Sequence, residues 1–384
     1  MNMNVAVSKE LFEIDATIDS LVKKIELLDY INPINIEKEK QHFFDSKFTI
    51  DPDFKYPEID FNGFQLHRSF FDQKIENIED EIIRKLYEDI VYTYMSLIEC
   101  IDNIGNGKKF YYNSLHAFGT PTETDVENAK FILHFDNEID SSETIPTYNS
   151  KEAEVYFRKF SKQYKFSYSI KHSDKLSAIA MVLNNIQTLV INKNHTFSKN
   201  ELKVLANHEI GLHMVTTMNG VLHPLKIFSH GFPNNVETQE GLAVYSEYMS
   251  NSLTLRRLKE LAYRVIAVDS LSKGYNFSKT FSLLKNAYNL NKEDSFYITL
   301  RVHRGGGFTK DYLYLTGLKK IFDFHNSGND LTPLLTGKVS LEYIETIGYL
   351  TKKGYALPAK HKNSAFESNQ NKNELIDFIL KNLK

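Results

Sequence analysis

The 384-residue chain has no tryptophan, a single cysteine and no long apolar run. One cysteine, Cys100, cannot form an intramolecular disulfide or a cysteine-based zinc site, and its apolar helical surroundings indicate a buried structural thiol. No apolar stretch approaches the roughly 18 residues of a membrane-spanning helix. The first residues, MNMNVAVSKELFEID, lack the apolar segment of a secretory signal, so we expect a cytoplasmic protein with no membrane partner.

The chain also lacks a large excess of either positive or negative charge. The formal net charge is −3, with 46 Lys and Arg against 49 Asp and Glu, which gives no general reason to expect nucleic acid or an anionic membrane as a partner. Hydrophobic residues make up 42% and charged residues 25%, values ordinary for a globular protein with a substantial core. The length allows two or three domains, or one large one.

Hydrophobic periodicity predicts a mostly helical α+β fold. We expect an N-terminal helical region over residues 1–148, a polar linker at Asp136 to Ser150, and a second domain over residues 149–384. The only convincing strand region is LSAIAMVLNNIQTLVIN, where the Asn184-Asn185 pair predicts a β-hairpin. Beyond it the chain is helical almost to its end, beginning with a capping box of Ser198 and Glu201.

The helix that follows this capping box carries the sequence HEIGLH, from His208 to His213. Zinc peptidases use H-E-x-x-H, with histidines four residues apart. Here they are five apart, which on a regular α-helix separates their directions by roughly 140°. A π-bulge near Gly211 would return both histidines to one face and leave Glu209 beside them, placed to act as a general base. The alternative is a buried, hydrogen-bonded histidine pair with a glutamate partner.

A catalytic zinc site needs a third protein ligand. The downstream candidates are His223, His230, Glu237, Glu240 and Glu247. Glu240 is the best placed, because its helix follows shortly after the first and can pack antiparallel to it, and because the small residues of the Q-E-G-L-A context permit close approach of the two helices. Glu247 is a candidate acceptor for a ligand histidine.

The motifs HEIGLH and QEGLA resemble those of the gluzincin peptidases, and more specifically of the tyrosine carboxypeptidase family, which includes the microtubule-associated enzyme that removes the C-terminal tyrosine of α-tubulin. The resemblance extends to NSLHAFGTPTE (113–123) and GGGFTKDYLYLTG (305–317), although Leu212 replaces a threonine of the family's metal motif. It implies a gluzincin-like catalytic domain with a small β-sheet, Zn²⁺ on His208, His213 and Glu240, and Glu209 as general base. It also implies release of a C-terminal Tyr or Phe from a peptide or protein.

A carboxypeptidase must bind a free α-carboxylate, for which arginine is the usual solution. The candidates are Arg301, Arg304 and Lys310, while Tyr312 or Tyr314 could donate a hydrogen bond to the developing oxyanion. The run Ile179 to Val190 is a candidate edge strand that holds the substrate backbone.

Two alternative functions differ in what the site must contain. A non-catalytic zinc-binding regulatory protein would not need Glu209 beside a ligand, and a zinc aminopeptidase would need acidic residues to hold a substrate amine. Nothing in the sequence indicates tubulin binding.

Overall fold

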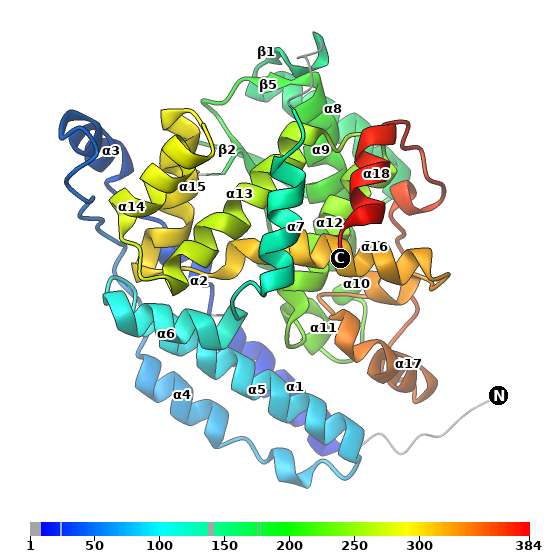
Figure 1. The fold of residues 1–384 in the computed structure, drawn as a ribbon. Coiled ribbons are helices and arrows are strands. Elements are labelled where there is room, and N and C mark those ends of the chain that lie inside the picture. The colour runs from blue at the N-terminus through cyan, green and yellow to red at the C-terminus, as the bar shows by residue number, and fades with distance from the viewer. Residues whose placement is uncertain (1–8, 24, 137–141, 175, 177) are drawn as a thin grey trace.

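The computed structural model describes residues 9–23, 25–136, 142–174, 176 and 178–384, and it confirms a mostly helical α+β fold (Figure 1). The helices of the first part are α1 (Lys9–Val22), α2 (Leu27–Ile31), α3 (Ile36–Asp45), α4 (Gly63–Phe71), α5 (Glu81–Asp102), α6 (Gly107–Phe118) and α7 (Glu123–Leu133). Those of the second part are α8 (Ser150–Ser161), α9 (Lys199–Leu205), α10 (Val215–Gly220), α11 (Ile227–His230), α12 (Asn235–Met249), α13 (Leu255–Ser272), α14 (Phe277–Ser282), α15 (Lys292–His303), α16 (Leu313–Asn326), α17 (Ile344–Lys352) and α18 (Glu374–Asn382). Two segments are π-helical, η5 (Ala206–Met214) and η6 (Leu283–Ala287).

The predicted hairpin is present. Strand β3 (Ala180–Leu183) pairs antiparallel with β4 (Thr188–Asn192), and β2 (Ser169–Ser173) pairs parallel with the other side of β4. The sheet order β2-β4-β3 makes β3 an edge strand. The connection is longer than an Asn-Asn turn, because Asn184–Ile186 form a 3₁₀ turn and Gln187 adopts the left-handed conformation.

The strand prediction was incomplete, since β2 and two further short strands lie outside the predicted hairpin. Part of the expected linker forms β1 (Pro146–Tyr148), which pairs antiparallel with β5 (Phe197–Ser198) just before the predicted capping box. That capping box is confirmed, with Ser198 and Glu201 each bonded to the other's backbone N–H. Residues 137–141 of the expected linker, and residues 1–8 of the segment used to argue against a secretory signal, lie outside the described residues.

The largest cluster of buried apolar side chains draws on residues from Leu11 to Leu383, on both sides of residue 148. A second cluster lies beneath the hairpin and includes Phe157, Leu189 and Ile210. The division into two domains at residue 148 stays a prediction. No helix in the described ranges is both long and apolar enough to cross a membrane.

Helices α12 and α16 cross at the closest approach of their backbones, through two glycines. A Cβ on Gly241 would lie 2.4 Å from the carbonyl carbon of Gly317, and a Cβ on Gly317 would lie 2.2 Å from the carbonyl oxygen of Glu237. We expected the small residues of QEGLA to admit the HEIGLH helix, and that assignment was wrong for Gly241. Because Gly241 has no side chain, the backbone of α16 can lie directly against α12. This contact fixes the position of α12.

Substitution at this crossing should be costly. We expect Gly241→Ala to lower the free energy of unfolding by about 1–3 kcal/mol, because the added methyl group meets backbone that cannot move aside. Gly348→Ala is the matched control: this exposed glycine lies in α17 with no heavy atom within 4 Å of the new Cβ, so the same change should be neutral or stabilising by up to about 1 kcal/mol. Denaturant unfolding measures both, and equal effects would contradict the close crossing.

Candidate active site

The HEIGLH segment lies in the π-helix η5, which confirms that the helix departs from regular α geometry. In a π-helical turn the backbone bonds run from i to i+5, so residues five apart return to the same face. The rings of His208 and His213 accordingly face each other, with centroids 4.9 Å apart. The extra residue between the histidines is therefore absorbed by the wider turn.

Gly211 has a different role from the one we expected. It is absent from the residues with positive φ, so the π-helix does not depend on the backbone freedom of glycine at this position. A Cβ there would lie 3.2 Å from the Tyr164 hydroxyl and 3.4 Å from Oδ1 of Asn363. Gly211 is favoured by packing, because it lets the side chains of Tyr164 and Asn363 lie against the wide turn without crowding.

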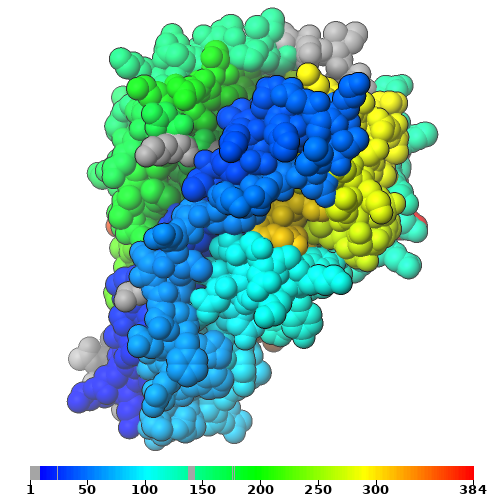
Figure 2. Space-filling model, turned by 90° about the vertical axis from the view of Figure 1, so that its left-hand side faces the viewer, coloured from blue at the N-terminus to red at the C-terminus, as the bar shows by residue number. Residues whose placement is uncertain are grey.

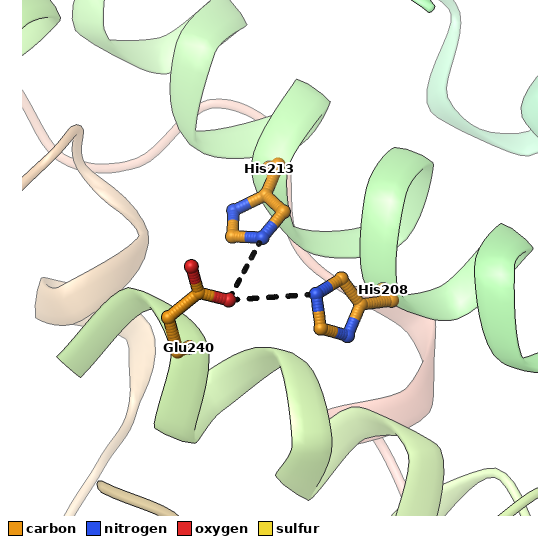
Figure 3. Close-up of side chains that lie close together, drawn as sticks. All are labelled: His208, His213 and Glu240. Carbon is orange, nitrogen blue, oxygen red and sulfur yellow. Dashed lines mark ion pairs between the residues drawn. The ribbon is translucent and has the colours of Figure 1, made fainter. Parts of the chain in front are cut away.

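Helix α12 brings Glu240 to the two histidines (Figure 3). Its Oε2 lies 3.6 Å from Nε2 of His208 and 3.7 Å from Nε2 of His213, and the three donor atoms all lie within 4.8 Å of one another. The other carboxylate oxygen, Oε1, accepts a hydrogen bond of 2.8 Å from Nζ of Lys310. Lys310 thus holds the carboxylate with Oε2 directed at the histidines.

These three residues pass a simple test for a metal site. Two imidazole nitrogens and one carboxylate oxygen are a donor set that suits a catalytic zinc ion. Glu240 Oε2 is buried and has no hydrogen-bond partner in the described part of the chain, although a buried carboxylate oxygen without a partner is costly. A cation between the three donor atoms would satisfy it.

The orientation of the His208 ring is fixed by a contact on the side away from Glu240. Its Nδ1 lies 2.8 Å from Oε1 of Glu247, a fully buried carboxylate. A carboxylate in this position accepts the proton of Nδ1 and leaves Nε2 as the nitrogen that faces Glu240. Glu247 is held in turn by Arg257, whose Nε lies 3.3 Å from Oε2. This arrangement matches the supporting role predicted for Glu247.

The two histidines differ in their electrostatic environment. Burial opposes a charged ring at His208, but the nearby carboxylates of Glu240 and Glu247 outweigh it and raise the pKa of the ring to about 9. At His213 burial prevails and lowers the pKa to about 4, despite the neighbouring Glu240 carboxylate. The pKa of Glu240 is held well below its usual range, since Lys310 and the histidines outweigh the effect of its burial. The pocket therefore favours an ionised carboxylate beside a neutral His213.

Glu209 lies on the same wide turn, next to strand β3. Its Oε2 accepts a hydrogen bond of 3.1 Å from the backbone N–H of Val182, so this N–H points away from β4. Burial raises the pKa of Glu209 to about 7. A carboxylate whose pKa lies near neutrality can both accept and return a proton.

Some of the residues predicted to bind substrate already form ion pairs or hydrogen bonds within the protein, and others do not. Arg301 forms a two-pronged pair with Asp311, one bond measuring 3.0 Å, and Lys310 is paired with Glu240. The hydroxyl of Tyr312 donates to the carbonyl of Phe118 at 2.8 Å, so this side chain joins the end of α6 to the 3₁₀ turn that precedes α16.

Tyr314 and Arg304 are less engaged. The Tyr314 hydroxyl forms no hydrogen bond with another described residue, and the Lys310 ammonium lies 5.2 Å from the centroid of its ring. Arg304 is buried and donates to Asn32. As substrate-binding residues, all five of the predicted side chains stay predictions.

The other candidate ligands lie in structural contacts. Glu237 pairs with Lys320, and His230 with Asp19. His223 is buried, with Nε2 against the carbonyl of Thr336 and Nδ1 accepting from the backbone N–H of Leu357.

Sequence analysis missed one line of charged residues that faces the site from α13. Arg257, Glu260 and Arg264 stand at positions i, i+3 and i+7 of an otherwise largely buried helix, and each is ion-paired with the next. That spacing places them on one helical face, which was a usable signal. Lys338 was also missed: it donates to the His213 carbonyl and to the Thr216 hydroxyl, both at 3.0 Å, and burial lowers its pKa to about 7.

The fold and site define a mostly helical α+β protein built around a buried cluster of two histidines and a glutamate. The model of the microtubule-associated tyrosine carboxypeptidase family matches residues 41–384, and the chain belongs to that family.

The individual relatives share little sequence identity with the chain. The chain is 25% identical over 382 residues to a Mus musculus protein described as "Putative tyrosine carboxypeptidase MATCAP2", covering 94% of this chain and 64% of the mouse protein. The chain thus spans less than two thirds of that relative. A solved structure described as a "putative lipoprotein of unknown function from Shewanella oneidensis" is 14% identical with a TM-score of 0.41, covering 75% of this chain and 71% of the other.

Removal of the carboxylate behind His208 tests the buried charge network. We expect Glu247→Ala to lower the free energy of unfolding by about 3–5 kcal/mol, because Arg257 and His208 both lose a buried partner. Glu127→Ala, which removes an exposed pair with Lys384, should leave the unfolding midpoint unchanged. Chemical unfolding of the two variants gives the comparison, and a stable Glu247→Ala protein would contradict the proposed importance of this network.

Proposed function

We propose that this chain is a zinc-dependent carboxypeptidase that hydrolyses the last peptide bond of a peptide or protein and releases a C-terminal tyrosine or phenylalanine. The observation that carries the proposal is the convergence of His208, His213 and Glu240, with Glu209 on the same wide turn. The arrangement supports a gluzincin-like catalytic core, in which a second helix supplies the glutamate ligand.

In this proposal His208, His213 and Glu240 hold the metal ion. Bound zinc supplies a Lewis acid that lowers the pKa of water and polarises the scissile carbonyl group. The rest of the ligand environment belongs to the chain itself, since Glu247 fixes the ring of His208 and Lys310 fixes the carboxylate of Glu240.

Glu209 moves the proton. It takes a proton from the attacking water as the new C–O bond forms, and gives it to the leaving nitrogen as the C–N bond breaks. The Val182 N–H holds Oε2 of Glu209 during this exchange. The unengaged hydroxyl of Tyr314 is the best candidate to donate to the carbonyl oxygen as negative charge develops on it.

The edge strand β3 supports binding of an extended substrate. The Val182 N–H lies on the side of β3 away from β4 and points to Glu209, so this free edge borders the proposed catalytic residues. A peptide that adds to this edge would pass directly by Glu209. We therefore propose that part of Ile179 to Val190 aligns the substrate backbone.

Two features of the site favour a carboxypeptidase over a non-catalytic zinc protein or an aminopeptidase. A non-catalytic zinc protein has no need of a buried glutamate beside its ligand, and the unpaired Arg304 suits a free carboxylate rather than a free amine. Preference for an aromatic residue follows the name of the family and is proposed for this chain on that basis. We do not extend the proposal to tubulin.

Cleavage of peptides that differ only in the last residue tests the activity. With zinc, we expect release of C-terminal Tyr or Phe, and we expect Glu209→Gln to reduce the rate about 10²–10⁴-fold because the general base is lost. The variant should bind as much zinc as the wild type, as measured by elemental analysis. No cleavage of any peptide by the zinc-loaded wild type would refute the proposal.

Metal content tests the ligand set without any substrate. We expect about one zinc ion per wild-type chain, and loss of zinc from His213→Ala and Glu240→Ala, because each removes one of three ligands. Glu237→Ala is the control: this glutamate lies on the same helix as Glu240 but pairs with Lys320. Full zinc in Glu240→Ala, or loss in Glu237→Ala, would contradict the assignment.

A further inference from the structure

Arg304 is a buried cation without a carboxylate partner. Only 8% of the residue is exposed, and no carboxylate of the described residues lies within ion-pair distance. Its guanidinium donates to the side-chain oxygen of Asn32 and lies 5.0 Å from the centroid of the Phe308 ring, while its Nε has no hydrogen-bond partner. The other arginines near the site, Arg257, Arg264 and Arg301, are each paired with Glu or Asp.

Neighbouring positive charges further destabilise the protonated form of Arg304. Burial and the nearby charge of Arg301 lower the pKa of Arg304 to about 10, with a further contribution from Arg264. Arg264 is also buried, and its Nε is a second guanidinium nitrogen without a partner in the part of the chain described. A cluster of buried cations with unsatisfied N–H groups is the environment that a bound anion stabilises.

The cluster is next to the proposed catalytic residues. The guanidinium of Arg264 and the ammonium of Lys310 lie 5.1 and 5.2 Å from the centroid of the same ring, that of Tyr314. Lys310 in turn contacts Glu240. One aromatic side chain therefore separates Arg264 from Lys310, which contacts the proposed ligand Glu240, and the α-carboxylate of a terminal residue is only a few bonds from its scissile carbonyl.

The N-terminal segment contributes to this cluster. Asn32 follows α2, outside the residues 41–384 that match the family model, yet among the described residues it supplies the side-chain acceptor of Arg304. Figure 2 shows the N-terminal part of the chain, in blue, crossing this face of the molecule and bordering the yellow residues around α14. The contact of Phe43 with Phe277 and Phe296 fixes that path.

We propose that Arg304, positioned by Asn32 and with Arg264 beside it, receives the α-carboxylate of the substrate's last residue. This subsite rests on the proposed carboxypeptidase function. Among the predicted carboxylate-binding residues it selects Arg304, since Arg301 and Lys310 are already engaged by Asp311 and Glu240. Asn32 is a neutral acceptor, so it orients the guanidinium without neutralising it.

Binding of a neutral peptide that ends in tyrosine, compared with its C-terminal amide, measures the subsite directly. On the Glu209→Gln background, which leaves the peptide intact, we expect calorimetry to show the acid binding about 10–100-fold more tightly than the amide. Arg304→Gln should bind the two peptides equally. Inorganic phosphate should not displace the peptide at similar concentrations, and displacement by phosphate would assign the subsite to inorganic anions instead.

The substitution Asn32→Asp distinguishes a substrate-binding role of Arg304 from a purely structural one. The substitution keeps the size of the side chain and supplies Arg304 with the carboxylate it lacks. A subsite role predicts a stable protein that has lost its preference for the acid and whose KM for cleavage rises at least about tenfold with little change in kcat. A purely structural Arg304 predicts a stabilised protein with unchanged binding, and that result would overturn the proposal. Asn194→Asp, an exposed position with the same change in charge, should bind like the wild type.

The outcomes distinguish this inference from the proposed function. Cleavage by the wild type together with unchanged acid preference in Arg304→Gln and Asn32→Asp would refute the subsite alone. Acid-selective binding that depends on Arg304, without cleavage of any peptide, would refute the peptidase activity and retain the subsite.

Discussion

The wide turn of η5 is the constraint on which the rest of the site depends. The helix is buried from Ala206 to Gly220 except at His213, so its two ends are each locked against different neighbours. A regular helix would turn one end by about 100° relative to the other for each added residue. The π-helical turn takes up the additional residue locally, so both ends keep their packing and the two histidines share a face.

Around this turn, the charged groups are arranged in two short series that meet at Glu240 and His208. Lys310 fixes Glu240 from one side, while Glu247 of α12 lies behind His208 and is followed by Arg257 and Glu260 of α13. Each buried charge in these series has a partner of opposite sign, which keeps the cost of burial moderate. Oε2 of Glu240 and the Nε atoms of Arg264 and Arg304 have no hydrogen-bond partner among the described residues, and all three belong to the proposed metal and carboxylate sites.

Sequence analysis succeeded where the information is local. The departure of HEIGLH from regular α geometry followed from a spacing of five, and the hairpin and the capping box followed from turn and cap residues a few positions apart. It fell short where contacts join distant segments. Nothing near Arg301 in the sequence shows that Asp311 engages it, and nothing near Gly241 shows that α16 crosses there. Asn32 could not be connected with Arg304 at all, because 272 positions separate them along the chain.

The contacts made by the N-terminal segment also bear on how this chain folds. The carboxylate of Asp15 accepts the backbone N–H groups of Lys226 and Ile227, and the last residue, Lys384, contacts Asn128. Asp15 thus reaches these backbone donors only after more than two hundred further residues have been synthesised. Pairings of such high sequence separation form slowly and leave apolar surface uncovered in the meantime. The part of the core that joins α1 to α11 is therefore expected to form only after residues 226 and 227 have been synthesised.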